Sequence, residues 1–264
     1  MHRLILGMPT LIETSTLEES VEICSELGLD FVEINMNLPQ YQINTLNVDK
    51  AKRLMEEKNI FFTIHLDENI NVSDFNLDVA KAYVDTVLWT IELAKELKIP
   101  ILNMHMNSGV HFTLPEEKVY LFDKYKDVYL DCLKSFRDIC TETIGNSEIK
   151  ICIENCSGYK NFMREGIDLL LESEVFGLTL DIGHNYIANE VDSQFILGRA
   201  NRLTHMHIHD AKKNKDHLAL GTGEIDLEEK IRIAKENKCR CVLETKTIAG
   251  LKESVKYIRH LEST

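Results

Sequence analysis

Three histidines stand at alternate positions in the segment 203–210. In an extended strand, successive side chains point to opposite faces, so His205, His207 and His209 share one face while the other face is mostly apolar. A single histidine on a strand is more often structural than a ligand. Three on one face, followed by Asp210, predict a face that binds something.

Histidine or acidic residues also follow other predicted strands, and the full set is His65, His105, Glu154, Asp181, His207 and Glu244. If the strands are parallel, these side chains meet at the carboxyl-terminal mouth of a barrel, where catalysis takes place in such folds. Each one alone could be a helix cap or a solvated carboxylate. Three carboxylates gathered without counter-charge would repel one another, and a divalent cation removes that conflict. Imidazole and carboxylate ligands suit Zn, Mn, Fe or Co, and the lack of cysteine in the set leaves Mg or Mn open.

Further residues are candidates for the same site. His184 follows Asp181 by three residues, and a tight turn at Gly183 would bring both side chains together. His217 lies on the polar loop after the segment 203–210 and could instead be solvated. Glu33 either reaches the mouth from the second strand or pairs with a lysine. The residues that we expect to contact the substrate are Glu33, His105 and Lys246.

The elements that must position these residues follow one pattern. Eight times along the chain, a short apolar run precedes a helical pattern, with short connections between them. Nearly continuous apolar runs are typical of parallel strands buried on both faces. We therefore predict a single α/β domain over residues 1–264, folded as a closed (β/α)8 TIM barrel. The predicted strands are 3–8, 30–35, 60–66, 99–105, 148–155, 176–181, 203–210 and 239–245.

The helical patterns lie at 16–28, 48–58, 77–98, 118–143, 162–172, 193–201, after 226, and at 251–261. Thr16 with Glu19 forms a capping box, and Asp226 is a good N-cap. The loop 106–117 is long for a strand-to-helix connection, which favours a lid or substrate loop. One apolar stripe is expected to face the barrel: Val79, Tyr83, Val87, Ile91 and Ala94.

The composition is that of an ordinary soluble protein, with 264 residues, 44% of them hydrophobic, and a formal net charge of -13. Without a long apolar run or a signal-peptide core, we expect a cytoplasmic protein that does not contact membranes. Its seven cysteines include no Cys-x-x-Cys pair, which predicts reduced core thiols. The negative charge disfavours nucleic acid as a partner, although a local patch at Lys212, Lys213 and Lys215 could still engage DNA.

The segments 27–34, 152–155, 180–184, 205–210, 217–223 and 243–245 resemble the xylose isomerase-like barrel superfamily. This superfamily includes sugar epimerases, inosose-metabolising enzymes and endonuclease IV. The resemblance implies that Glu154, Asp181, His207 and Glu244 match the four metal ligands of the ketose epimerase branch. It also implies that the two glutamates, on opposite sides of the substrate, take and return a proton.

The endonuclease IV branch adds more ligands, and the resemblance implies that His65, His105, His184 and His217 match them. With one aspartate, that branch holds three zinc ions, which activate water and hold a phosphodiester. Here the position expected for this aspartate holds Lys215, and Asp216 comes one place later. This departure weighs against a third zinc ion.

We predict a divalent-metal-dependent isomerase or epimerase of a sugar or sugar phosphate, with Glu154 and Glu244 as the catalytic pair. A bound metal polarises a hydroxy-carbonyl group and acidifies the carbon-bound proton, and a nearby carboxylate removes that proton. The cofactor is Zn, Mn or Co, with one or two ions expected and a third left open. The alternatives are a zinc-dependent phosphodiesterase resembling endonuclease IV and a catalytically silent metal-binding barrel. The particular sugar and the oligomeric state are not determined by the sequence.

Overall fold

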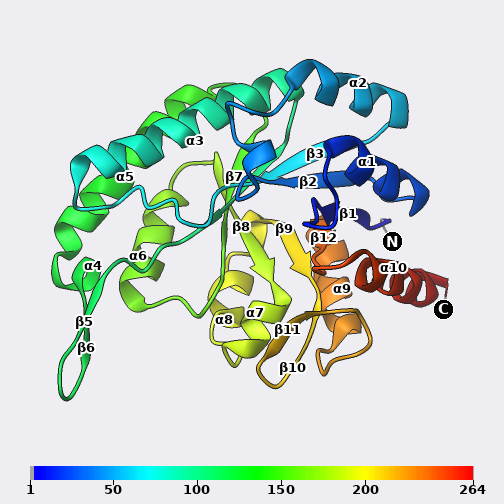
Figure 1. Ribbon diagram of the computed structural model, residues 1–264. Coiled ribbons are helices and arrows are strands. Elements are labelled where there is room, and N and C mark those ends of the chain that lie inside the picture. Colours follow the sequence, from blue (N-terminus) through cyan, green and yellow to red (C-terminus); the bar gives the residue numbers. More distant parts are fainter. Residues whose placement is uncertain (1–2, 264) are drawn as a thin grey trace.

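Eight parallel strands close into a barrel in the order β1-β12-β9-β8-β7-β4-β3-β2 (Figure 1). In this computed structural model the described residues are 3–263, so residues 1, 2 and 264 of the predicted domain lie outside them. The predicted single-domain (β/α)8 barrel is confirmed. The barrel strands are β1 (Ile5–Pro9), β2 (Phe31–Asn35), β3 (Phe61–His65), β4 (Ile101–His105), β7 (Lys150–Glu154), β8 (Phe176–Asp181), β9 (Leu203–Ile208) and β12 (Arg240–Leu243).

The register of the strands brings the candidate residues to one level at the carboxyl ends. His105 on β4 is opposite Glu154 on β7, and Asp181 on β8 is opposite His207 on β9. Almost every strand residue is buried, because helices cover the outer face and side chains fill the interior.

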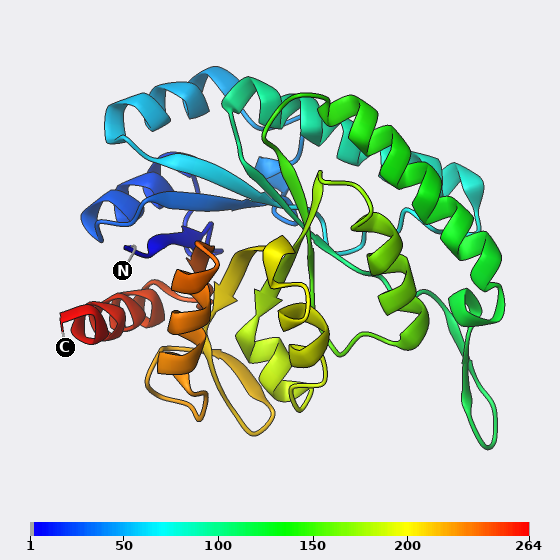
Figure 2. The ribbon, with the colours of Figure 1, turned by 180° about the vertical axis from the view of Figure 1, so that it is seen from behind.

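Helices form a layer around the barrel (Figure 2). The larger ones are α1 (Leu17–Glu26), α2 (Val48–Lys58), α3 (Leu77–Leu97), α5 (Lys126–Ile144), α6 (Asn161–Leu170), α9 (Leu227–Glu236) and α10 (Ile248–Ser263). As predicted, the hydroxyl of Thr16 caps α1 by accepting the N–H of Glu19, and Asp226 caps α9. The Glu19 carboxylate accepts from the N–H of Ser15, one residue before the position expected in a capping box.

The helix predicted at 118–143 begins later than expected. Residues 118–120 form β6 (Lys118–Tyr120), which pairs antiparallel with β5 (His111–Thr113). A one-turn helix, α4 (Leu121–Lys124), follows, and Tyr125 leaves the helical conformation before α5 begins. The long loop is therefore a hairpin, and it projects away from the body of the molecule in both views (Figures 1 and 2).

The structure also differs from the prediction at the strand 203–210 and at the polar loop after it. β9 ends at Ile208, and the chain then forms the antiparallel pair β10 (Asp210–Lys212) and β11 (Lys215–Leu218). The helix predicted at 193–201 is shorter, because α8 (Ser193–Leu197) is followed by the 3-10 turn η2 (Ala200–Arg202). A short helix that was not predicted, α7 (Ile182–Ile187), starts directly after β8, and another 3-10 turn, η1 (Pro39–Tyr41), precedes α2.

The stripe predicted on α3 is correct except at its start. Val87, Ile91 and Ala94 are buried, whereas Val79 in the first turn is 38% exposed and Ala80 takes the inward position. All seven cysteines are free thiols, as predicted, but only five are buried in the core, because Cys132 and Cys156 are half-buried. Over residues 3–263, the structure contains no helix with the length and apolar character needed to span a bilayer.

Candidate metal centre

Four side chains from four neighbouring strands converge at the mouth of the barrel. Glu154 ends β7, Asp181 ends β8, His207 lies on β9 and Glu244 follows β12, and one ligand atom of each lies within 4.8 Å of the others. His207 Nδ1 is 2.9 Å from Glu244 Oε2, 3.1 Å from Glu154 Oε1 and 3.8 Å from Asp181 Oδ2. Three carboxylates thus surround one imidazole nitrogen.

The charges of these buried groups depend on one another. Burial opposes ionisation of Glu154, but His207 and His105 hold its pKa well below the usual range. The pKa of Glu244 is also held well below its usual range, against its burial, mainly by His207. Burial disfavours a charged His207, yet Glu154 and Glu244 raise its pKa well above the usual value. The site therefore stabilises positive charge at its centre, which is what a divalent cation requires.

The donor set fits a metal ion. Oε2 of Glu244 is buried and makes no hydrogen bond of acceptable geometry among the described residues, although His207 Nδ1 lies 2.9 Å from it. Three carboxylates and one imidazole suit Zn, Mn or Co. Glu154, Asp181, His207 and Glu244 could therefore hold one divalent ion.

His65 and His105 approach the other oxygen of Glu154. Their Nε2 atoms lie 3.4 and 3.2 Å from Glu154 Oε2, while His207 faces Oε1. Nδ1 of His65 is 2.8 Å from the carbonyl oxygen of Leu66, so the neutral ring donates there and its Nε2 is free to act as a ligand. Burial lowers the pKa of His65, but Glu154 raises it to about 9. The two rings could hold a second ion that shares Glu154.

The structure also brings His184 and His217 to this mouth. His184 Nδ1 lies 3.4 Å from Asp181 Oδ2, and His217 Nε2 lies 3.5 Å from Glu244 Oε1. Asp216 reaches both histidines, at 3.0 Å from His217 Nδ1 and 3.8 Å from His184 Nε2. The side chain of Lys215 is exposed. Asp216 thus lies beside the two histidines, although its sequence position departs from the endonuclease IV pattern.

Glu33, expected at the substrate or beside a lysine, lies elsewhere. It is 1% exposed and sits beneath the four-residue site. Its Oε2 accepts from the Thr63 hydroxyl and lies 2.8 Å from His205 Nε2, and its Oε1 lies 2.9 Å from His207 Nε2. Because both oxygens face these buried groups, none is left for a substrate. Burial raises the pKa of Glu33, but the two histidines lower it more.

Lys246, the third expected substrate contact, is at the mouth. Its Nζ lies 2.8 Å from Glu244 Oε1, and its side chain is 59% exposed. A substrate oxygen could therefore be reached by this ammonium group. His105 is 17% exposed and also borders the opening.

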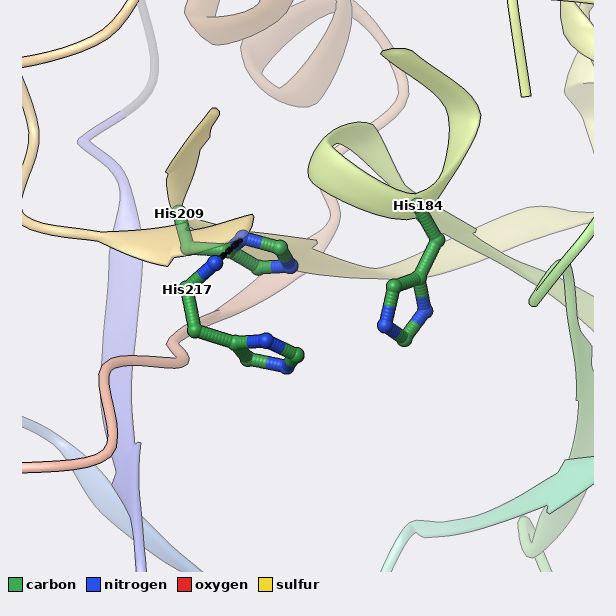
Figure 3. A group of neighbouring side chains, drawn as sticks. All are labelled: His184, His209 and His217. Carbon is green, nitrogen blue, oxygen red and sulfur yellow. Dashed lines mark hydrogen bonds between the residues drawn. The ribbon is translucent and has the colours of Figure 1, made fainter. Parts of the chain in front are cut away.

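The site contains buried polar residues that were not predicted as members. His205 contacts Glu33, His209 contacts Asp181, and Asn103 donates to Glu154 Oε2. The alternation of histidines in the segment 203–210 was a signal for His205 and His209. Asn103 likewise stands two residues before His105, on the same face of β4. Figure 3 shows His209 and His217 with parallel rings and His184 across from them.

Comparisons with known proteins agree with this architecture. A curated relative, an uncharacterized protein of Methanocaldococcus jannaschii, is 27% identical over 223 residues, which are 81% of this chain and 77% of that protein. A D-tagatose 3-epimerase-like protein superposes with a TM-score of 0.79 at 23% identity, over 98% of both chains.

Two more solved structures share the fold. A D-allulose 3-epimerase from Methylomonas sp., in complex with D-allulose, has a TM-score of 0.72 at 15% identity, over 98% of this chain and 97% of that one. The IolI protein with a bound zinc atom has a TM-score of 0.73 at 17% identity, over 98% of this chain and 96% of that one. Residues 21–261 match the model of one family along almost the whole barrel. The chain therefore belongs to the xylose isomerase-like TIM barrel family.

Proposed function

We propose that this chain is a divalent-metal-dependent isomerase or epimerase that acts on a sugar or sugar phosphate. The observation that carries the proposal is the pair of buried glutamates, Glu154 and Glu244, on either side of His207 Nδ1, at 3.1 and 2.9 Å. Two similar structures, a D-tagatose 3-epimerase-like protein and a D-allulose 3-epimerase with its sugar, support this reaction class.

Glu154, Asp181, His207 and Glu244 would hold the metal. When bound, a divalent ion polarises the carbonyl and hydroxyl oxygens of a sugar and acidifies the neighbouring C–H bond. The zinc atom bound by the IolI protein supports a metal at this kind of barrel.

The protein's own groups would move the proton. Glu154 and Glu244 have pKa values held well below the usual range, so both are ionised and able to accept a proton. One carboxylate would remove the carbon-bound proton, and the other, once it has taken up a proton from water, would return that proton from its own side. Lys246, beside Glu244, and His105, beside Glu154, would contact substrate oxygens.

One observation favours a second candidate function, zinc-dependent phosphodiester hydrolysis. Asp216 lies within 3.8 Å of His184 and 3.0 Å of His217, so it completes a donor set for a further ion. The number of metal ions bound per chain separates the two candidate functions.

The direct test is a panel of ketoses, free and phosphorylated, offered to the Mn-loaded protein in deuterated water. We expect one of them to acquire solvent deuterium at the carbon that exchanges its proton, because the carboxylates exchange protons with water. A chelator-treated sample is the control. Hydrolysis of a phosphodiester substrate, with no label in any sugar of the panel, would contradict the proposal.

A further inference from the structure

His209 follows β9 directly and is fully buried, and both of its ring nitrogens are engaged. Nε2 lies 3.0 Å from each oxygen of Asp181. Nδ1 accepts the backbone N–H of His217 at 2.8 Å, drawn as the dashed line in Figure 3. The ring thus bridges a candidate metal ligand and the β10–β11 hairpin.

These contacts determine where the ring carries its proton. An N–H group can donate to Nδ1 only if that nitrogen is unprotonated. The neutral ring therefore has its proton on Nε2, where it is donated to Asp181. His209 lies near His184 and His217, with ring centroids 5.6 and 4.2 Å away, but it has no lone pair left for a metal.

The space around the ring holds it in this position. A Cβ atom at Gly183 would lie 1.9 Å from Cε1 of His209, so only glycine leaves room for the ring. The ring of His217 stacks in parallel against that of His209, at an interplanar angle of 4°. His217 has a left-handed backbone, with φ of 53°, in the conformation that directs its N–H at Nδ1.

The next residue secures the rest of this loop. The carboxylate of Asp210 accepts the backbone N–H groups of Gly221, Gly223 and Ile225, at 3.0, 2.7 and 3.2 Å. His209 thus attaches β11 to the end of β9, and Asp210 attaches the loop that follows β11 to the same place.

We propose that His209 is a positioning residue. It orients the carboxylate of Asp181 for metal binding, and it ties to that ligand the hairpin that carries His217. The inference rests on the metal centre proposed above. It assigns His209 to the support of the site and not to a metal.

Two amide variants separate the two contacts of the ring. In His209→Gln, the amide nitrogen extends to the position of Nε2 and can still donate to Asp181. In His209→Asn, the shorter amide reaches the position of Nδ1, so it keeps the contact with the His217 N–H and loses the one with Asp181. The measurement is the affinity and stoichiometry of Mn²⁺ binding to chelator-treated protein by titration calorimetry.

We expect His209→Asn to weaken Mn²⁺ binding by about 10–100-fold at unchanged stoichiometry, the range found for lost outer-shell contacts. His209→Gln should stay close to wild type. One ion fewer in both variants, with unchanged affinity for the rest, would identify His209 as a ligand and overturn the proposal. Equal weakening in both variants, or no weakening in His209→Asn, would also overturn it.

A measurement on the wild-type protein needs no variant to fold. In ¹⁵N-histidine-labelled, chelator-treated protein at mildly alkaline pH, we expect a proton on Nε2 of His209 and none on Nδ1. Adding ¹¹³Cd²⁺ should produce metal–nitrogen coupling at His207 and none at His209. If no ion binds at all, the proposed function fails while the tautomer still tests the bridge from Asp181 to His217. A proton on Nδ1 would refute that bridge in either case.

Discussion

Glu154, Glu244 and Glu33 are all buried glutamates, and the groups that surround each carboxylate distinguish the first two from the third. Glu154 and Glu244 are each buried against imidazole groups that keep them ionised at the centre of the barrel. Glu33 is equally buried, but both of its oxygens face His205, His207 and Thr63. Its position behind His207 matches that of a carboxylate that orients a metal-bound histidine.

Glu154→Gln and Glu244→Gln should each lower turnover by about 10²–10⁴-fold, because each removes a proton carrier. Neither change opens a core cavity, so the fold should persist by circular dichroism. Glu56→Gln, at an exposed position on α2, is the matched control and should behave as wild type. Turnover near the wild-type rate in either site variant would refute the catalytic pair.

The buried histidines predict that the thermal stability of the metal-free protein falls as pH rises, whereas its affinity for a metal ion increases. The pKa of His65 and that of His184 are raised to about 9, against their burial, chiefly by contact with Glu154 and, for His184, with Asp181 as well. Groups with a raised pKa stabilise the fold below the unfolded value of about 6.5 and lose that contribution as pH rises through the folded value. The Tm of the chelator-treated protein should therefore decrease as pH rises from about 6.5 to about 9.

Metal ligation needs neutral imidazole, so affinity for Zn²⁺ should rise across the same interval with release of protons. Calorimetric Tm values with and without Zn²⁺ check both trends. A Tm of the chelator-treated protein that is constant across this interval would contradict the assignment of charge.

At the scale of elements, β8 and α7 share one residue. Asp181 ends β8 as a candidate ligand and also caps α7, since its Oδ1 accepts the N–H of His184 at 2.6 Å. α7 begins directly after β8 because the last residue of the strand is also the N-cap of the helix. This places His184, in the first turn of α7, beside the same site. The sequence did not predict α7, because a helix of six residues is too short to show a helical periodicity of apolar side chains.

Asp181→Asn and Asp181→Ala separate these two roles. Both should weaken Mn²⁺ binding, because both remove the carboxylate. Asparagine caps helices as well as aspartate does, so the alanine variant should be less stable by about 0.5–2 kcal/mol. Urea unfolding of the chelator-treated variants measures the difference, and equal stabilities would show that the cap contributes nothing.

At the scale of the whole molecule, the charge of -13 and the carboxylate-lined mouth act together. Such a field attracts divalent cations and repels polyanions, which favours a small sugar over a nucleic acid. The lysines 212, 213 and 215 are exposed on the β10–β11 hairpin, and Lys212 pairs with Glu224 at 3.7 Å.

Elemental analysis of protein purified without chelator should give one or two ions per chain. Asp216→Ala should leave that number unchanged, and Lys215→Ala, at the exposed neighbour, serves as the control. Three zinc ions that fall to two only in Asp216→Ala would show that Asp216 completes a third site. That result would move phosphodiester hydrolysis ahead of sugar isomerisation.

Hydrophobic periodicity and the residues that begin and end helices were sufficient to predict the barrel. Each βα unit has its own apolar face, and the signals for its ends lie within its own sequence. Thr16, Asp226 and the apolar runs before His65 and Glu154 are such local signals. Residues that end parallel strands must share one mouth, so the convergence of these side chains followed from topology. The hairpins β5–β6 and β10–β11 could not be predicted from the sequence, since strands of three or four residues are too short to show an alternation of apolar and polar side chains.

Which polar residues border the opening of the barrel and which lie beneath it was decided only by tertiary structure. Glu33 meets His205 across 172 positions of sequence, and Asp181 meets His209 across 28. Alternation along residues 203–210 assigned three histidines to one face, but depth along that face depends on the register of β9 with β8 and β12. That register places His205 beneath the site, His207 within it and His209 against Asp181, because hydrogen-bond partners across a closed barrel are set by its closure and not by local sequence.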